Sequence, residues 1–410
     1  MKRKMVRLLA LIGAFGVAFA VNPFKAAQAE GISIPDESLK NAIIETLELS
    51  TDVITENDMK RLTVLETPEN DPAKMIKNLT GLEYAVNLVS LDLDYNKITD
   101  LSPLSGLTKL ETLDISYNDG AVSGVDGVTD ISMLSSLTSL KRFSSLSNAG
   151  VSDYSVVANF KELNYLNLSL CGLEDISFVR GLSKLEKGYF AFNQISDVLP
   201  LKDLTSLKTL AIGNNKIADI SPLKNLTGLT QFTVENNYID DFTAVFGMKS
   251  LTYLDVSRNF VSDEQIGTLM NEITAEKLIV SPAADETKKE GVFALSETQK
   301  NLKIGETYRL SVKEGELTDA KYIVSDSAVA TVSENGEVKA IGEGECIVGV
   351  KKNGYVRYLA LTVVAGENTG SENAGGEKKN CKGCNGALSI FPAVVTAIGA
   401  GIVLTKKKRK

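Results

Sequence analysis

The sequence predicts an α/β solenoid with a parallel sheet on its concave side, followed by an all-β sandwich and a C-terminal transmembrane helix. Three observations support this prediction. A leucine pattern recurs about every 22 residues from residue 88, short alternating strands fill residues 290–364, and an uncharged stretch lies near the C-terminus. Self-similarity at a fixed period of roughly 20–50 residues is typical of repeat architectures, so periodicity carries most of the argument.

The repeat follows the pattern L-x-x-L-x-L-x-x-N. Leu91 and Leu93 alternate with polar Asp92 and Asp94 in the first copy, which predicts a strand with one buried face. One such strand cannot bury that face alone, so the coils must stack on their neighbours into a right-handed leucine-rich-repeat solenoid over residues 88–280. Eight copies begin at Leu88, Leu110, Leu140, Leu163, Leu185, Leu207, Leu229 and Leu251, with steps of 22, 30, 23, 22, 22, 22 and 22 residues.

The ninth position of the repeat predicts a structural ladder of buried amides. A buried amide must be hydrogen-bonded, and the free backbone groups of the turn after the strand are its natural partners. Cys171 falls at a position where the pattern accepts Asn or Cys. We therefore interpret this position as structural rather than ligand-binding. The ladder consists of Asn96, Asn118, Asn148, Cys171, Asn193, Asn215, Asn237 and Asn259.

Some repeats depart from the pattern. The second copy is eight residues longer than most, with a loop predicted at 120–129. Ser145 replaces an aliphatic residue and Gly188 occupies another core position, which predicts local slack in the core around residues 140–190. Pro103, Pro200 and Pro222 share one phase on the return side of the coil, where a missing N–H is tolerated.

The 22-residue period, the return segment N-x-I-x-D-I-S-P-L and the flanking segments resemble internalin-type leucine-rich-repeat proteins of Gram-positive bacteria. The resemblance covers about residues 30–280 and implies a small N-terminal helical cap over residues 30–87. Leu39, Ile43 and Leu47 would lie on one face of a helix opened at 35–36, and Thr55 resembles a second helix start. The resemblance implies the fold and a surface protein, but no particular ligand.

Beyond a linker at 281–289, residues 290–364 predict an all-β sandwich. Strands are expected at 302–310, 329–332, 338–340 and 342–348, and Asn335-Gly336 is a strong hairpin-turn signal. This segment resembles the group 2 bacterial immunoglobulin-like domain of surface adhesins, whose usual role is spacing, although the tryptophan often found there is missing. Cys346 replaces a small inward-facing residue and is expected to be a buried thiol.

Both ends of the chain carry targeting signals. A basic head, an apolar run at 8–21 and a small-residue site at 27–29 predict a signal peptide over residues 1–29. Residues 387–405 contain no charge and are long enough to cross about 30 Å of hydrocarbon as a helix. The basic tail at 406–410 favours the cytoplasmic side, so we expect the rest of the chain outside, with a disordered linker at 365–386.

Composition excludes several function classes. Ten basic residues lie in the signal peptide and tail, so the segment between them carries a net charge of −18, against −8 for the full chain. This acidic segment repels nucleic acid. The chain has no histidine, which excludes a Ser-His-Asp triad and a Cys–His pair. Cys381 and Cys384 form a lone C-x-x-C without the second pair that zinc needs; a local disulfide and processing or lipid attachment stay open.

We therefore predict no catalytic residue, no metal and no cofactor. A cell-surface protein-binding or adhesion protein is the favoured function. A passive envelope protein and a carboxylate-based cell-wall hydrolase are the alternatives, and the hydrolase would need two acids converging in a cleft. The expected partner is an extracellular protein of a host or bacterial surface, or a glycan, with membrane attachment through the C-terminal segment.

The concave strand face is the default binding surface of such a solenoid. Tyrosine and arginine, which are enriched at binding hot spots, gather near the middle of the predicted sheet, whereas its ends are acidic. The alternative interpretation is that exposed aromatic residues merely pair across neighbouring strands. The candidate partner-binding residues are Arg142, Tyr165, Asn167, Lys187, Tyr189, Gln231 and Tyr253.

Overall fold

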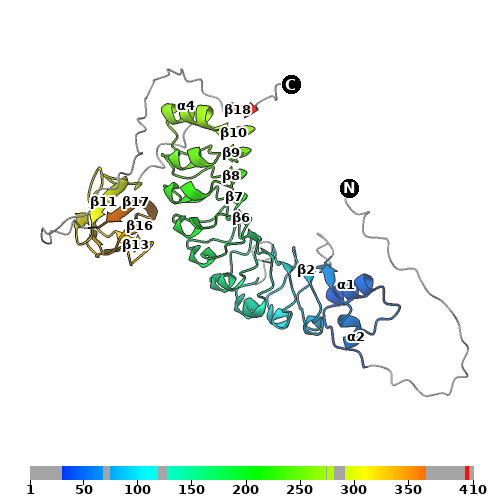
Figure 1. The fold of residues 1–410 in the computed structure, drawn as a ribbon. Helices are drawn as coiled ribbons and strands as arrows, with labels where there is room; N and C mark the ends of the chain where they lie inside the picture. The colour runs from blue at the N-terminus through cyan, green and yellow to red at the C-terminus, as the bar shows by residue number, and fades with distance from the viewer. Residues whose placement is uncertain are drawn as a thin grey trace, which may run out of the picture.

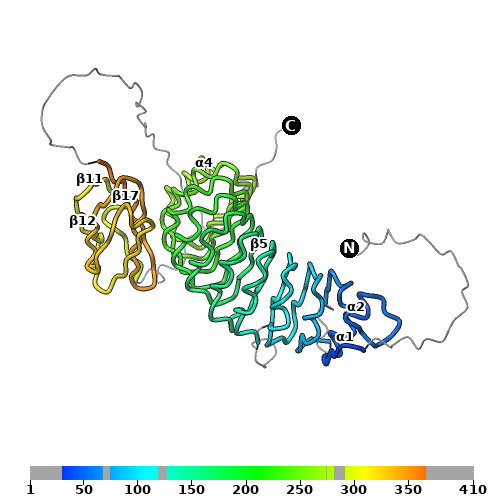
Figure 2. The backbone as a smooth tube through the Cα atoms, turned by 60° about the horizontal axis from the view of Figure 1, so that its bottom comes forward, coloured from blue at the N-terminus to red at the C-terminus, as the bar shows by residue number. Residues whose placement is uncertain are grey.

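The computed structural model describes residues 30–67, 74–118, 127–273, 275–280, 291–365 and, for the backbone alone, 402–405. It shows a curved solenoid of stacked coils with a separate β-rich region at its C-terminal end (Figures 1 and 2). The predicted signal peptide, the linker at 281–289 and residues 366–386 of the predicted linker at 365–386 lie outside the described residues. Within the part that is described, no helix is both long and apolar enough to span a membrane.

Two short helices cover the first coil. α1 (Glu37–Leu47) begins after Asp36, whose Oδ1 accepts the backbone N–H groups of Ser38 and Leu39 at 3.0 and 3.1 Å. α2 (Glu56–Met59) begins with a capping box in which Thr55 and Asp58 bond each other's backbone N–H groups. The predicted helix starts at 35–36 and at Thr55 are thus confirmed, and both helices bury apolar residues in the same core as the repeats.

Ten parallel strands form one continuous sheet, which confirms the predicted leucine-rich-repeat solenoid. Leu91, Leu113, Leu166 and Leu210 lie in one register column, each no more than 1 % exposed. The strands are β1 (Val64–Glu66), β2 (Ser90–Asp92), β3 (Thr112–Asp114), β4 (Arg142–Ser144), β5 (Tyr165–Asn167), β6 (Lys187–Tyr189), β7 (Thr209–Ala211), β8 (Gln231–Thr233), β9 (Tyr253–Asp255) and β10 (Lys277–Val280).

The last strand of this sheet has an antiparallel neighbour. Residues 402–405 form β18 (Ile402–Thr405), which pairs with β10. These four residues belong to the predicted transmembrane helix at 387–405 but adopt a strand, so the helical prediction is wrong for them. The rest of that segment lies outside the described residues.

The return side of most coils is a short 3-10 helix, and from the first repeat to the seventh an aspartate caps the start of this helix. In the first repeat Asp100 Oδ1 accepts the Ser102 N–H at 2.8 Å, and equivalent aspartates repeat this bond in the next six coils. Pro103, Pro200 and Pro222 lie in the first turn of their helices, where no N–H is needed. The helices are η2 (Leu82–Tyr84), η3 (Ser102–Leu104), η4 (Ser132–Ser136), η5 (Ser155–Asn159), η6 (Ser177–Val179), η7 (Leu199–Leu201), η8 (Ser221–Asn225) and η9 (Thr243–Gly247).

The core around residues 140–190 is filled, so the predicted slack is wrong. At Ser145 the missing aliphatic volume is replaced by Tyr154, which is 2 % exposed and whose Oη lies 3.1 Å from Ser145 Oγ. At Gly188 the fully buried Phe190 occupies the space, because a Cβ on residue 188 would lie 2.9 Å from Phe190 Cε2. Each small residue is thus compensated by a large neighbour, as close packing of a protein interior requires.

The solenoid ends in an α-helix and is followed by a C-terminal β domain, residues 291–365. The helix α4 (Asp263–Glu272) is capped by Ser262 and covers the last coil. The domain contains a four-stranded sheet in the order β11-β17-β16-β13 and a three-stranded sheet in the order β12-β15-β14, with their own apolar core. Its strands are β11 (Gln299–Lys303), β12 (Thr307–Arg309), β13 (Lys321–Val324), β14 (Ala330–Val332), β15 (Glu337–Ala340), β16 (Gly344–Lys352) and β17 (Tyr355–Val364).

Three predictions about this domain have clear outcomes. A single strand at 302–310 was expected, but Gly305, with φ +89°, breaks it into β11 and β12, which belong to different sheets. The predicted hairpin turn lies between β14 and β15, where Gly336 has a positive φ of 79°. Cys346 is buried and free, and burial raises the pKa of its thiol to about 11.

Candidate functional site

The candidate binding residues lie on the strand face of the solenoid, in two register columns. Five of them are the first residues of their strands: Arg142, Tyr165, Lys187, Gln231 and Tyr253. Asn167 and Tyr189 are the last residues of β5 and β6 and pair with each other in the second column. The strands β4, β5 and β6 are adjacent, so these residues form one surface, whereas β7 separates Gln231 from it.

The structure brings three of these side chains into direct contact. The Arg142 guanidinium carbon lies 3.9 Å from the centroid of the Tyr165 ring, a cation–π geometry. The Tyr165 and Tyr189 rings follow at 5.4 Å, tilted by 45°. Burial raises the pKa of the Tyr189 hydroxyl, with a further contribution from Tyr165, and Arg142 opposes the shift. We call Arg142, Tyr165 and Tyr189 the aromatic cluster.

The other candidates do not join this cluster. Asn167 Oδ1 accepts the N–H of Ser169 at 3.2 Å, so its amide is engaged with its own turn. Tyr253 lies three strands beyond β6, where the Lys277 ammonium approaches its ring at 5.1 Å. Gln231 is exposed on β8 between the two groups. The sheet therefore presents one central cluster and a separate Tyr253–Lys277 pair.

Sequence reasoning missed a column of residues just after the strands. The eighth residue of every repeat adopts a left-handed conformation, with φ between 52° and 60°. Two neighbours in this column are apolar: Leu170 is 43 % exposed and Phe192 is 55 % exposed. The eighth position was not counted as outward-facing, although large apolar residues there, beside Asn and Ser in other repeats, were a usable signal. Leu170 and Phe192 belong to repeats four and five, which also carry Tyr165 and Tyr189 of the aromatic cluster, and we call these four residues together with Arg142 of repeat three the patch.

The ninth-position ladder is buried and engaged with the backbone. In a typical coil the Asn215 amide donates to the carbonyls of Phe190 and Ile212 at 3.0 Å each, while its Oδ1 accepts the Ile195 N–H at 3.0 Å. Equivalent bonds are made by Asn118, Asn193, Asn237 and Asn259. Asn96 and Asn148 instead use a neighbouring hydroxyl, of Thr67 or Ser145, as the acceptor for one of their donors. No ladder residue is more than 6 % exposed, so the ladder presents nothing to a ligand.

Cys171 departs from the ladder for a local reason. In most coils the N–H that lies twenty residues before the ladder asparagine donates to the side-chain oxygen of that asparagine. For Cys171 the corresponding residue is Val151, whose N–H donates to the carbonyl of Asn148 at 3.2 Å instead. No acceptor is required from residue 171 there. The thiol instead donates toward the carbonyls of Ser145 and Ser169, at 3.1 and 3.4 Å.

The C-terminal end of the concave face carries a half-buried acid. Glu235 lies over Gly213, and its Oε1 accepts from Asn214 Nδ2 at 3.1 Å. Burial raises the pKa of the Glu235 carboxyl, Asp255 adds to the shift, and Arg258 opposes it. Glu235 Oε2 is buried without a hydrogen-bond partner. An unpaired buried carboxylate oxygen is costly, so this residue opposes stability at neutral pH.

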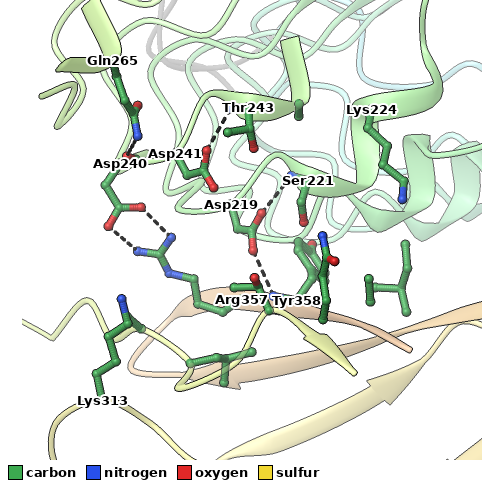
Figure 3. Close-up of a pocket in the computed structure, with 17 residues that line it drawn as sticks. Asp219, Ser221, Lys224, Asp240, Asp241, Thr243, Gln265, Lys313, Arg357 and Tyr358 are labelled. Atoms are coloured by element: carbon green, nitrogen blue, oxygen red, sulfur yellow. Dashed lines mark hydrogen bonds and ion pairs between the residues drawn. The ribbon is translucent and has the colours of Figure 1, made fainter. Parts of the chain in front are cut away.

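A cleft of about 650 Å³ lies at the junction between the return side of the repeats and the C-terminal β domain (Figure 3). Its charged lining is largely used for internal bonds: Arg357 pairs with Asp240, and Asp241 caps η9 through Thr243. Burial raises the pKa of the Asp219 carboxyl, and bonds from Ser221 and the charge of Arg357 oppose this. The cleft is thus a junction between domains. Because most of its charged groups already pair within the protein, it offers a ligand fewer free contacts than the strand face does. Among the described residues, no cluster of acids and cysteines has the arrangement of a metal site.

The parallel sheet, the buried ladder and the capped return helices define a leucine-rich-repeat protein. The family model for leucine-rich repeats (2 copies) matches residues 86–120, 189–225 and 205–247. Among curated proteins, no sequence matches the chain.

Solved structures place the chain near internalins, and its repeat region is internalin-like. An internalin (inlF) from Listeria monocytogenes is 29 % identical, with a TM-score of 0.50, over 61 % of this chain and 76 % of that one. Internalin C2 from the same organism is 27 % identical, with a TM-score of 0.44, over 62 % and 100 %. The functional domain of InlJ from Listeria monocytogenes is 15 % identical, with a TM-score of 0.40, over 80 % and 97 %.

Proposed function

We propose that the protein is a non-enzymatic binding protein of the cell surface that presents the concave face of its repeats to an extracellular protein. In this proposal the C-terminal β domain is an immunoglobulin-like domain between the repeats and the point of attachment to the cell surface. The resemblance of the repeats to internalins supports the surface assignment.

The observation that carries the proposal is the patch formed by the aromatic cluster with Leu170 and Phe192. A few residues carry most of the binding energy of a protein interface, and tyrosine and arginine are enriched among them. Exposed apolar groups gathered on one face mark interaction sites more often than scattered ones do. The strands beneath the patch are fixed by the packed core, so little ordering cost would accompany binding.

The alternative that the two tyrosines only stabilise the sheet makes a different prediction. Tyr165 and Tyr189 are partly exposed and contact each other, as a purely structural pair would. Leu170 and Phe192, however, project from the turn and are exposed by about half of their surface. A stabilising role does not account for two neighbouring exposed apolar side chains.

The test is a binding screen of the full-length protein against a panel of purified extracellular proteins and a glycan array. We expect a specific protein partner whose affinity falls at least tenfold in Tyr165→Ala/Tyr189→Ala, a loss of about 1.4 kcal/mol or more. Tyr84→Ala removes an exposed tyrosine of the N-terminal cap and is the matched control, which should bind as the wild type does.

Other outcomes favour the other functions. Binding that survives the double substitution places the interface elsewhere, and binding confined to sugars indicates a glycan receptor. If neither a protein nor a glycan binds, that result supports a passive envelope protein. Turnover of cell-wall glycan by the purified chain, abolished by substitution of paired carboxylates, would replace the proposal with a hydrolase.

A further inference from the structure

The C-terminal β domain meets the repeats through an open strand edge. β17 pairs with β16 from Tyr355 to Val363, but with β11 only from Ala360 to Val364. Among the described strands, residues 355–359 therefore have no partner on their second side, and this edge faces the return side of the solenoid (Figure 3). An open edge invites pairing with another chain, so its coverage by the repeats removes an aggregation hazard.

Tyr358 joins this edge to two consecutive coils. Its Oη lies 2.6 Å from Asp197 Oδ1 and accepts the N–H of Val198 at 3.0 Å. Its own N–H donates to Asp219 Oδ2 at 3.0 Å. Tyr358 and Val356 are at most 2 % exposed, and both belong to the apolar core of the repeats rather than to that of their own domain. The contact is thus both packed and hydrogen-bonded.

Arg357 joins the same edge to a third coil. Its guanidinium makes two bonds to the Asp240 carboxylate at 2.9 and 3.2 Å, and a third to the carbonyl of Ala218 at 2.7 Å. Its Nε donates to the carbonyl of Phe293 at 2.8 Å. The residue is 7 % exposed. A buried guanidinium that loses its carboxylate is strongly destabilising, so the arrangement favours the docked position over any position that separates the domains.

The repeats that receive this edge differ from the others at the contact positions. The serine that follows the capping aspartate by two residues in repeats one to four is Leu199 in repeat five, which is 2 % exposed. The residue before that aspartate is Ser196 in repeat five and Ala218 in repeat six, both small and buried. In the first four repeats the equivalent residues are exposed: Thr99, Thr129, Ser152 and Glu174. Because Ser152 and Ser196 are the same residue type, the burial of Ser196 comes from the domain that covers it. The two changes of residue, Leu199 and Ala218, both occur in repeats that the domain covers, as a specific interface would require.

We propose that the C-terminal β domain is rigidly docked on the return side of repeats five to seven, rather than being a mobile spacer. The docked domain leaves the concave face uncovered, since Figures 1 and 2 show it beside the 3-10 helices and away from strands β6–β9. It also fixes the direction of the concave face relative to Val364, beyond which the chain leaves the domain. This inference does not depend on the identity of any binding partner.

The test is the distance between spin labels in the full-length protein, measured by pulsed electron paramagnetic resonance. The labels are placed on exposed positions by Ser183→Cys in the repeats and Lys339→Cys in the domain, with Cys381→Ser and Cys384→Ser to keep the labelling specific. We expect one narrow distance distribution. Arg357→Ala/Tyr358→Ala should replace it with a broad distribution. A broad distribution in the parent protein, or a narrow one that the double substitution leaves unchanged, overturns the proposal.

A matched pair of single substitutions separates docking from folding. Asp175 and Asp197 cap their 3-10 helices in the same way, each accepting an N–H at 2.8 Å, but only Asp197 of the two contacts the domain. Asp197→Ala should broaden the distance distribution, whereas Asp175→Ala should preserve it at a similar melting temperature. Equal broadening in both variants would show that loss of the cap, and not of the junction, releases the domain.

Discussion

The Tyr358 hydroxyl lies 2.6 Å from the Asp197 carboxylate, although 161 residues separate the two along the chain. Burial raises the pKa of this hydroxyl well above its usual value, and the charges of Asp197 and Asp219 add to the shift. The tyrosine therefore stays neutral at neutral pH, and its hydroxyl donates a hydrogen bond to Asp197. One aspartate thus serves two purposes, because it also caps the helix of its own coil.

Tyr358→Phe should destabilise the protein by about 1–3 kcal/mol, because the change removes the hydroxyl that pairs with Asp197 and with the N–H of Val198. The ring stays, so packing is little altered. Chemical denaturation followed by circular dichroism measures the loss. Tyr84→Phe, at an exposed position of the cap, is the control and should be neutral. A neutral Tyr358→Phe would mean that water replaces the hydroxyl without cost.

Much of the solenoid was predictable because it is built from periodic signals. The phase of the leucines assigns Leu91 and Leu113 to the buried face, and the structure places both in one column. The ninth position likewise predicts buried residues. Local periodicity suffices here because each coil contacts mainly its neighbours.

Features that depend on volume or on distant contacts were not predictable in this way. The slack expected at Gly188 is absent because Phe190 fills it, a compensation between residues that the repeat pattern treats separately. The docking of Arg357 and Tyr358 joins segments more than one hundred residues apart. In the sequence this contact is marked only by small departures from the repeat consensus, at Leu199 and Ala218, which do not by themselves indicate what covers them.

The compensation at Gly188 predicts a non-additive pair of substitutions. Gly188→Leu restores the repeat consensus but should cost about 1–3 kcal/mol, because the new side chain overlaps Phe190. Phe190→Ile alone should leave a cavity. The double variant restores the usual pair of residues and should recover much of the loss, which a double-mutant cycle of unfolding free energies measures. Additive effects would show that the two side chains do not share one space. Gly106→Ala, where an added Cβ meets nothing within 4 Å, is the control.

The ladder predicts a large cost for a single amide. Asn215→Ala removes one acceptor and two donors from buried backbone groups of the adjoining coils. We expect the free energy of unfolding to fall by at least about 1–3 kcal/mol, because each backbone group left without a partner stays desolvated and makes no hydrogen bond. Urea denaturation measures the change. Asn225→Ala, at the exposed end of η8, removes an amide of the same type and should change stability little. Similar losses for both would contradict a special role for the ladder.

Glu235 predicts a pH-dependent gain in stability. Burial raises the pKa of its carboxyl in the folded protein, so the folded state disfavours the charged form. The resulting destabilisation is fully present above the raised folded pKa and disappears as the pH falls below the unfolded value. Glu235→Gln removes the charge while keeping the shape. It should therefore be more stable than the wild type at pH 7, and this advantage should shrink as the pH approaches 4.

Unfolding free energies from urea titrations at several pH values between 4 and 7 provide the measurement. The matched control is Glu174→Gln on the exposed return side of the fourth repeat, which should follow the wild type throughout. Because Glu235 Oε2 has no hydrogen-bond partner, the amide of the variant loses no bond at that atom. An advantage of Glu235→Gln that is the same at every pH would show that lost packing strain, and not lost charge, is its cause.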